Sequence, residues 1–361
     1  MTEHSAPSRE ERQTRSHLMR LFERHGFHPR THLGQNFLID LNLIEFVVRE
    51  AELNGDDLVL EIGAGTGGMT TFMARQAGHV ISVELDRNMY QLASEAIERY
   101  SNVTLLNQDA LKNKNNFAPE VLQAIEHHLA PWGPLLTGSE AGDERLEAGG
   151  SESFADDATS GDVSKLTGTE LGEELHRGIT PRVPRKLKLI ANLPYSIATP
   201  VISNLVATEI PWSRMVVTIQ FEVGQRMQAT TGDEHYGALS VWLQSQCHVE
   251  MLRRLPPTVF WPRPKVDSAI MKVTPNPEAK AKIADRKFFH DYIRRVFNYR
   301  RKFLRSVLCG MYRKQLEKSQ IDALLESMGF TSSARAEELD VDAHVALGTR
   351  LQQEIEKTPE S

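Results

Sequence analysis

Cysteine and long apolar runs are both scarce in this chain. Two cysteines, Cys247 and Cys309, occur among 361 residues, and they cannot by themselves supply a disulfide framework or the four ligands of a zinc site. No stretch approaches the roughly 18 apolar residues of a transmembrane helix, and residues 1–20 lack the apolar segment of a secretory signal. We therefore expect a cytoplasmic protein with reduced cysteines and no metal site, neither secreted nor inserted in a membrane.

Acidic charge is concentrated in one segment. The chain carries a net charge of −6, but residues 137–178 hold eleven acidic and three basic side chains, so the remainder stands at +2. This segment is rich in glycine, serine and threonine and has few large apolar side chains, so it cannot bury enough surface to fold. We predict that residues from about 131 to 184 form a disordered insertion in the first of two domains.

Positive charge gathers near the C-terminus. Residues 286–314 contain ten lysines and arginines and one acidic residue, and the six aromatic residues between 288 and 303 lie among them at helical spacing. The pattern fits amphipathic helices whose charges lie in water, and it also fits a phosphate-binding surface. A second basic cluster lies in residues 1–30. Nucleic acid is therefore a candidate partner, with the solvated-helix interpretation left open.

Strands and helices alternate through the first domain. Asp40 is the predicted N-cap of a helix over 41–51. Apolar runs predict strands at 58–62, 80–83, 103–106, 187–190 and 215–220, and the segments at 69–76, 88–100 and 200–208 are expected to be helical. This alternation indicates an α/β fold with a parallel, doubly wound sheet. We expect a basic segment over 1–30, a Rossmann-like domain over 31–274 and a small all-helical domain over 275–361.

A glycine-rich loop follows the first predicted strand. Gly63, Gly65 and Gly68 match the pattern G-x-G-x-x-G, and Glu84 follows at about the offset of a ribose-binding carboxylate. Glycines let the backbone approach a ligand closely, and the next helix points its N-terminus at it. NAD and S-adenosylmethionine both bind this arrangement, so the loop alone leaves the cofactor open.

Polar groups also end the later strands. Asp109 follows the third strand, where it can accept a hydrogen bond from an adenine amino group, and Asn192 follows the fourth. Chance helix caps explain such a series poorly, and ligands bind at this edge of open α/β sheets. The order, with nucleoside contacts first and an amino-group acceptor last, favours methyl transfer to an amine over hydride transfer.

The segment Asn192-Leu193-Pro194-Tyr195 carries the predicted chemistry. The Asn192 side chain and the Pro194 carbonyl offer two acceptors to an exocyclic amino group, and Tyr195 offers a flat face for stacking. The alternative is an ordinary strand end and turn, because asparagine and proline are common turn residues. The polar groups at the three preceding strand ends favour the functional interpretation.

In these motifs the chain resembles the bacterial small-subunit ribosomal RNA adenine dimethyltransferases (KsgA/RsmA type), to which the Erm resistance methylases are related. The resemblance covers residue 30 to about residue 353, apart from the insertion. It rests on runs that occur in the family's order: HLGQNFL at 32–38, EIGAGTG at 61–67, VELD at 83–86, QDAL at 108–111, NLPY at 192–195, PRPKVDS at 262–268, RRKFL at 300–304 and RAEEL at 335–339.

The resemblance implies a function and a set of site residues. It implies a monomer that uses S-adenosylmethionine to dimethylate N6 of two adjacent adenines in a 3′-terminal hairpin loop of 16S rRNA, within a precursor of the small ribosomal subunit. It also implies that the helical domain over 275–361 binds the rRNA. The implied cofactor contacts are Asn36, Leu38, Gly63, Gly65, Glu84, Asp109 and Asn192. The implied catalytic residues are Asn192, Pro194, Tyr195 and Phe260, with Tyr195 and Phe260 sandwiching the flipped adenine.

Two departures and three alternatives accompany the resemblance. The acidic insertion is foreign to the family pattern, and Phe221 stands where a basic residue is common. An Erm-like enzyme that acts on large-subunit rRNA is one alternative, disfavoured by Leu193 and by the helical tail. A binding protein for RNA or ribosome assembly, with little catalysis, is the second. An NAD-dependent dehydrogenase is the third, disfavoured because no histidine or lysine for hydride transfer follows a strand.

Overall fold

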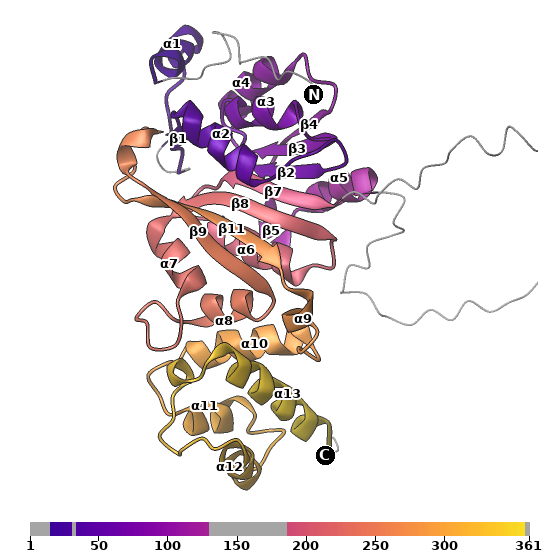
Figure 1. Ribbon diagram of the computed structural model, residues 1–361, viewed down its shortest axis with the longest axis vertical. Helices are drawn as coiled ribbons and strands as arrows, with labels where there is room; N and C mark the ends of the chain where they lie inside the picture. The colour runs from indigo at the N-terminus through magenta and orange to yellow at the C-terminus, as the bar shows by residue number, and fades with distance from the viewer. Residues whose placement is uncertain (1–14, 31–33, 130–185, 358–361) are drawn as a thin grey trace, which may run out of the picture. The chain divides into compact units, whose positions relative to one another are not determined.

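A seven-stranded mixed sheet forms the centre of the fold (Figure 1). The computed structural model describes residues 15–30, 34–129 and 186–357, so the predicted insertion and residues 1–14 of the basic segment lie outside the described residues. The strand order is β4-β3-β2-β7-β8-β11-β9. The strands span Leu58–Ile62 (β2), His79–Glu84 (β3), Val103–Asn107 (β4), Leu187–Asn192 (β7), Trp212–Gln220 (β8), Cys247–Leu255 (β9) and Ser268–Pro275 (β11).

The five predicted strands are all present, and their neighbours pair in parallel from β4 to β8. The expectation of a purely parallel sheet is wrong at the other edge. There β11 pairs antiparallel with both β8 and β9. Parallel neighbours are usually joined by a crossover α-helix, whereas residues 256–267 join β9 to β11 without one and reverse the direction of the chain. Strand β9 is buried only at its two ends, Cys247 and Leu255, so its apolar signal in the sequence is weaker than that of the fully buried β2.

Helices cover both faces of the sheet. They span Leu41–Glu50 (α2), Gly68–Ala74 (α3), Arg87–Ile97 (α4), Pro119–Leu129 (α5), Ala198–Ala207 (α6), Phe221–Gln228 (α7) and Ala238–Gln244 (α8). Successive side chains of a strand point to opposite faces. Leu58 and Leu60 accordingly join one apolar cluster with α5 and α6, and Val59 joins another with α2 and α3. Asp40 caps α2 as predicted, because its carboxylate accepts the N–H groups of Asn42 and Leu43.

The C-terminal part of the described chain is helical, as expected. The helices are Pro277–Lys280 (α9), Arg286–Phe297 (α10), Leu304–Met311 (α11), Lys318–Ser327 (α12) and Val341–Lys357 (α13), with a 3₁₀ turn at Ala336–Glu338. Buried aromatic side chains join them to the sheet domain. The Tyr236 hydroxyl donates to the Leu339 carbonyl at 2.9 Å, and Phe289 of α10 packs against Trp242 of α8. The apolar cluster runs without a break from the sheet into these helices.

The N-terminal segment lies near the carboxyl ends of the parallel strands. Helix α1 (Arg15–His25) places Phe22 against Phe37 of β1 (Phe37–Leu38) and against Trp261 of β10 (Phe260–Trp261). Strands β1 and β10 pair antiparallel, and a 3₁₀ turn at Pro257–Val259 precedes β10. A small hairpin, β5 (Leu111–Asn113) and β6 (Asn116–Phe117), follows β4. Within the described ranges, no helix has the length and apolar character needed to cross a membrane.

Candidate active site

One cavity collects most of the predicted site residues at the carboxyl ends of β2, β3, β4 and β7. Its wall comes from residues 34–37, the glycine loop, the end of β3, residues 108–110 and residues 192–197. Eight of the ten predicted site residues line it: Asn36, Gly63, Gly65, Glu84, Asp109, Asn192, Pro194 and Tyr195. Parallel strands bring these segments together because their carboxyl ends meet at one sheet edge.

The glycine loop needs glycine at the positions that face the cavity. Gly63 and Gly65 have positive φ angles of 85° and 58°, which side chains rarely adopt. A Cβ atom on Gly65 would also lie 3.0 Å from the Phe37 ring, and one on Gly63 would lie 3.3 Å from Cδ of Pro194. The loop therefore keeps the backbone open to a ligand and lets residues 34–37 approach it.

Glu84 ends β3 as a carboxylate held by the backbone. Its two oxygens accept the N–H groups of Gly65 at 2.8 Å and Asp86 at 2.9 Å. Burial raises the pKa of Glu84, and these two hydrogen bonds oppose that shift by stabilising the charged form. The side chain is thus oriented before any ligand arrives, at the edge where a ribose would lie.

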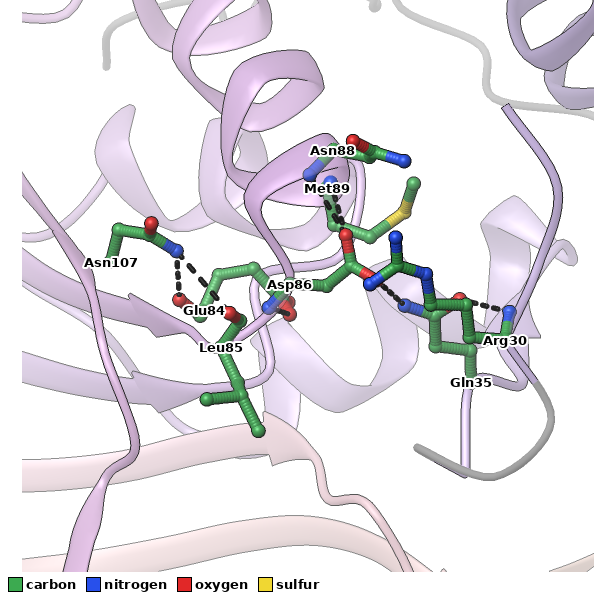
Figure 2. A network of polar contacts seen from close by, with 8 residues as sticks. All are labelled: Arg30, Gln35, Glu84, Leu85, Asp86, Asn88, Met89 and Asn107. Carbon is green, nitrogen blue, oxygen red and sulfur yellow. Dashed lines mark hydrogen bonds and ion pairs between the residues drawn. The ribbon is translucent and has the colours of Figure 1, made fainter. Parts of the chain in front are cut away.

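Asp86 connects the N-terminal segment to this strand end (Figure 2). One carboxylate oxygen accepts the N–H groups of Asn88 and Met89 and so caps α4. The other accepts Nε2 of Gln35 at 3.2 Å and pairs with Arg30 at 3.2 Å. Neither Gln35 nor Asp86 was among the expected site residues, although both lie within family motifs. Their position in those motifs is the signal that could have indicated them.

Asp109 and Gln108 line the cavity side by side after β4. One Asp109 oxygen accepts the Leu111 N–H at 2.9 Å, which leaves the other for a ligand. The Nε2 atom of Gln108 is buried and has no hydrogen-bond partner within the described residues. Burying a hydrogen-bond donor without a partner costs free energy, which a bound ligand could recover by accepting this hydrogen bond. The cavity wall therefore offers one unpaired donor, Nε2 of Gln108, together with the carboxylates of Glu84 and Asp109. These groups fit a nucleoside-containing cofactor such as S-adenosylmethionine.

Asn192 is fixed by a residue far away in sequence. Its Nδ2 donates to the Asn36 carbonyl at 2.7 Å, and this bond leaves Oδ1 as an acceptor. The Pro194 carbonyl accepts the Ile197 N–H at 3.0 Å, and a carbonyl can accept a second hydrogen bond. Both acceptors expected from the sequence therefore belong to residues of the cavity wall, and each has at least one lone pair still available.

Tyr195 has its hydroxyl tied to the sheet. The hydroxyl lies 2.6 Å from Oγ of Ser268, which is fully buried in β11. Burial raises the pKa of Tyr195, so the phenol is neutral at physiological pH. Ser268 ends the PRPKVDS motif at 262–268, but this contact with Tyr195 was not expected from the sequence.

Phe260 and Leu38 do not line the cavity. They pair with each other across β10 and β1, and their side chains lie in the apolar cluster beneath, 1% and 7% exposed. The placement of Phe260 differs from the expected sandwich around a base, because its strand position points the ring into the core. A base could stack on Phe260 only after a rearrangement that exposes its ring, and this role stays a prediction.

Glu61 is a further carboxylate close to the site. It is fully buried in β2 and accepts hydrogen bonds from the hydroxyls of Thr70 and Ser82, both at 2.6 Å. Burial raises its pKa to about 7, and the two hydroxyls partly oppose the shift. Glu61 joins β2, β3 and α3 beneath the glycine loop, and it does not line the cavity. Glu61 thus ties the strand before the glycine loop to the helix after it.

Comparison with known proteins identifies the family. Residues 26–343 match the family model described as ribosomal RNA adenine dimethylase. The chain belongs to this family. The "Ribosomal RNA small subunit methyltransferase A" of Pediococcus pentosaceus is 32% identical over 333 residues, covering 92% of this chain and 93% of its own length. The protein of the same name from Natranaerobius thermophilus is 31% identical, covering 90% of this chain and 92% of its own length.

Solved structures agree with this fold. A dimethyladenosine transferase from Plasmodium falciparum matches 87% of this chain and 97% of its own, with a TM-score of 0.59 and 20% identity. The 23S rRNA methyltransferase ErmE matches 88% of this chain and 100% of its own, with a TM-score of 0.54 and 19% identity. These likenesses confirm the Rossmann-like fold.

Family membership confirms the enzyme class expected from the sequence. This chain is an S-adenosylmethionine-dependent adenine dimethyltransferase of ribosomal RNA. The dehydrogenase alternative is therefore wrong. Within the described part of the chain, no cluster of histidine, cysteine or acidic residues is placed to hold a metal ion.

Proposed function

We propose that this protein dimethylates N6 of two adjacent adenines in a 3′-terminal hairpin loop of 16S rRNA, within a precursor of the small ribosomal subunit. The relatives above support the choice of subunit, since both are named as small-subunit methyltransferases. The observation that carries the proposal is the shared wall of one cavity, which Glu84 and Asp109 line together with Asn192 and Pro194. We further propose that the protein acts as a monomer in the cytoplasm.

The cavity residues divide into a cofactor side and a base side. On the cofactor side, the backbone at Gly63 and Gly65 would approach the methionine part of S-adenosylmethionine, Glu84 would hold the ribose and Asp109 the adenine. Asn36 would contact the cofactor from the segment above it, and Leu38, whose side chain is buried, would contribute through its backbone. When bound, the cofactor supplies a methyl group activated by a positively charged sulfur.

On the base side, Asn192 and Pro194 orient the amine of the target adenine. The N6 lone pair of adenine is delocalised into the ring and is a poor nucleophile. Oδ1 of Asn192 and the carbonyl oxygen of Pro194 would each accept a hydrogen bond from one of the two N6 hydrogens. These two hydrogen bonds would turn the nitrogen towards tetrahedral geometry and direct its lone pair towards the methyl carbon. Positioning of this kind can lower a barrier by about 7–11 kcal/mol at its limit.

Tyr195 would hold the extruded base by stacking. Moving a base out of its helix or loop costs about a few kcal/mol, and stacking on an aromatic ring returns about 1–3 kcal/mol. As the new N–C bond forms and the S–C bond breaks, the nitrogen becomes positively charged and its extra proton can leave to water. A strong general base is therefore not needed. A second transfer uses the remaining N6–H, which requires room for the first methyl group.

Methyl transfer to under-methylated small subunits tests the proposal. The protein is incubated with labelled S-adenosylmethionine and such subunits, and the modified adenines are mapped by mass spectrometry of nuclease fragments. We expect dimethyladenosine at two adjacent positions near the 3′ end of 16S rRNA. Label found only in large-subunit RNA would instead assign the Erm-like activity, and binding without label would assign a non-catalytic role.

A further inference from the structure

Phe221, where this chain departs from the family pattern, packs under an arginine from a different strand. The family commonly has a basic side chain at this position, whereas here an aromatic ring begins α7. The guanidinium carbon of Arg254 in β9 lies 4.2 Å from the centre of the Phe221 ring. A cation over an aromatic face is attracted by the ring electrons. Position 221 therefore has a positive charge beside it, supplied by another part of the chain.

A β-bulge directs Arg254 towards α7. The register of β9 on β11 shifts by one residue at Leu252. Such a bulge exchanges the faces to which the following side chains point. Arg253 accordingly lies over Phe46 of α2, and Arg254 lies over Phe221 of α7. Helices α2 and α7 belong to the apolar clusters on opposite faces of the sheet, so these two neighbouring arginines serve different layers.

Arg254 also holds Asp267, which lies at the end of the connection between β9 and β11. Nε of Arg254 donates to Oδ2 of Asp267 at 2.6 Å, and Nη2 lies 2.6 Å from the same oxygen. The Asp267 carbonyl accepts the Phe221 N–H at 3.0 Å. Although the Arg254 side chain is 61% exposed, its planar guanidinium contacts a ring and a carboxylate at once, which fixes its orientation.

Ser268 connects this anchor to the active site. It directly follows Asp267, and it pairs across the strands with Leu255, the residue after Arg254. Oγ of Ser268 lies 2.6 Å from the hydroxyl oxygen of Tyr195, which lines the cavity. The ion pair between Arg254 and Asp267 therefore holds the strand end from which Ser268 reaches Tyr195.

We infer that Arg254 is a positioning residue for methyl transfer, which holds Asp267 so that Ser268 keeps the Tyr195 ring in place. The positive charge that the family commonly carries at position 221 comes here from β9, and the Phe221 ring orients it. Arg254 does not line the cavity, so it acts through these residues and not on the base. The inference rests on the proposed stacking role of Tyr195.

Steady-state kinetics on under-methylated small subunits separates positioning from RNA binding. Full-length variants are compared for kcat and for the KM of the subunits, with saturating labelled S-adenosylmethionine and with thermal unfolding as the check on folding. The test variants are Arg254→Ala, Arg254→Lys, and Arg254→Ala combined with Phe221→Lys. Arg253→Ala is the matched control, since Arg253 is an exposed arginine of the same strand that also lies over a phenylalanine ring.

Positioning predicts a loss in kcat that a cation at position 221 reverses. Arg254→Ala should lower kcat about three- to tenfold and leave KM within about twofold, because one ionic hydrogen bond and one ring contact are lost outside the cavity. Arg254→Lys should fall in between, since lysine keeps the charge but not the fork of donors. Adding Phe221→Lys to Arg254→Ala should restore at least about half of kcat, because the new cation lies next to Asp267.

Two further measurements test the route through Tyr195. In a Tyr195→Phe background, Arg254→Ala should lower kcat by less than about twofold, because the hydroxyl through which it acts is already absent. Hydrogen exchange needs no activity: Arg254→Ala should speed amide exchange at 265–268 about threefold, and Arg253→Ala should leave it unchanged. Equal exchange in both variants and the wild type would show that Arg254 does not anchor this segment.

Three kinetic results would overturn the inference. One is a wild-type kcat for Arg254→Ala. Another is an equal rise in KM for Arg254→Ala and Arg253→Ala with kcat unchanged, which would assign both arginines to charge contacts with RNA. The third is an undiminished effect of Arg254→Ala in the Tyr195→Phe background. Methylation of large-subunit RNA alone by the wild type would instead refute the proposed substrate, and the same variants would then be compared on that RNA.

Discussion

The hydroxyl oxygens of Tyr195 and Ser268 lie 2.6 Å apart, although the two residues are 73 positions apart in the chain. Ser268 is fully buried and pairs with Gln220 of β8 on one side and Leu255 of β9 on the other. The antiparallel edge of the sheet therefore sets the angle at which the Tyr195 ring borders the cavity. Ser268 acts as a positioning residue for the base-stacking side chain.

A double-mutant cycle tests this coupling. Ser268→Ala and Tyr195→Phe each remove one end of the hydrogen bond, and each should lower kcat by a few-fold, since such a bond contributes about 1 kcal/mol. The double variant should be no slower than the slower single variant, because both changes remove the same interaction. Methyl-transfer rates under saturating cofactor measure the effect, with thermal unfolding as the check on folding. Fully additive losses would refute the coupling.

Asn192→Ala should separate catalysis from binding. The substitution removes the acceptor for the target amine and the donor to the Asn36 carbonyl, so we expect methyl transfer to fall by at least about 100-fold. Binding to small subunits, measured by co-sedimentation, should stay within about threefold of the wild type. Retention of more than a tenth of the activity would contradict the role proposed for this side chain.

Loss of the Gln35–Asp86 contact should weaken cofactor binding. Gln35→Ala removes the hydrogen bond from Gln35 to the buried carboxylate of Asp86. This bond holds residues 34–37, which line the cavity, against the end of β3. Gln35→Glu goes further, because it places a second negative charge against Asp86. We expect the Kd for S-adenosylhomocysteine, measured by calorimetry, to rise about tenfold for Gln35→Ala and more for Gln35→Glu. Gln91→Ala, on the outer face of α4, is the control and should bind normally.

Glu61 should make folding stability depend on pH. Its pKa is about 7 in the folded protein against an ordinary value of 4.5, so the folded state binds more protons between these values. The associated stability is present below about pH 4.5 and is lost as the pH rises through 7. Relative to Glu61→Gln, the wild type should lose about 2 kcal/mol of unfolding free energy between pH 5.5 and pH 8. Urea unfolding at both pH values measures this, and parallel changes in the two proteins would contradict it.

Much of the candidate site could be read from local sequence. The glycine loop, Glu84, Asp109 and the segment from Asn192 to Tyr195 each follow an apolar strand, and parallel strands bring such ends together. The hydrogen bonds that hold these groups in place could not be predicted from the sequence. The bond from Asn192 to Asn36 and the link from Asp86 to Gln35 join segments whose approach depends on the packing of α1, β1 and β10.

The sequence alone determined the family, the cofactor and the positions of the parallel strands along the chain, because these depend on short motifs and on local apolar runs. Only the tertiary structure decided that β9 and β11 run antiparallel, that Phe260 points into the core and that Ser268 reaches Tyr195. Strand pairing and register arise from contacts between residues distant in the chain, and local periodicity does not specify such contacts.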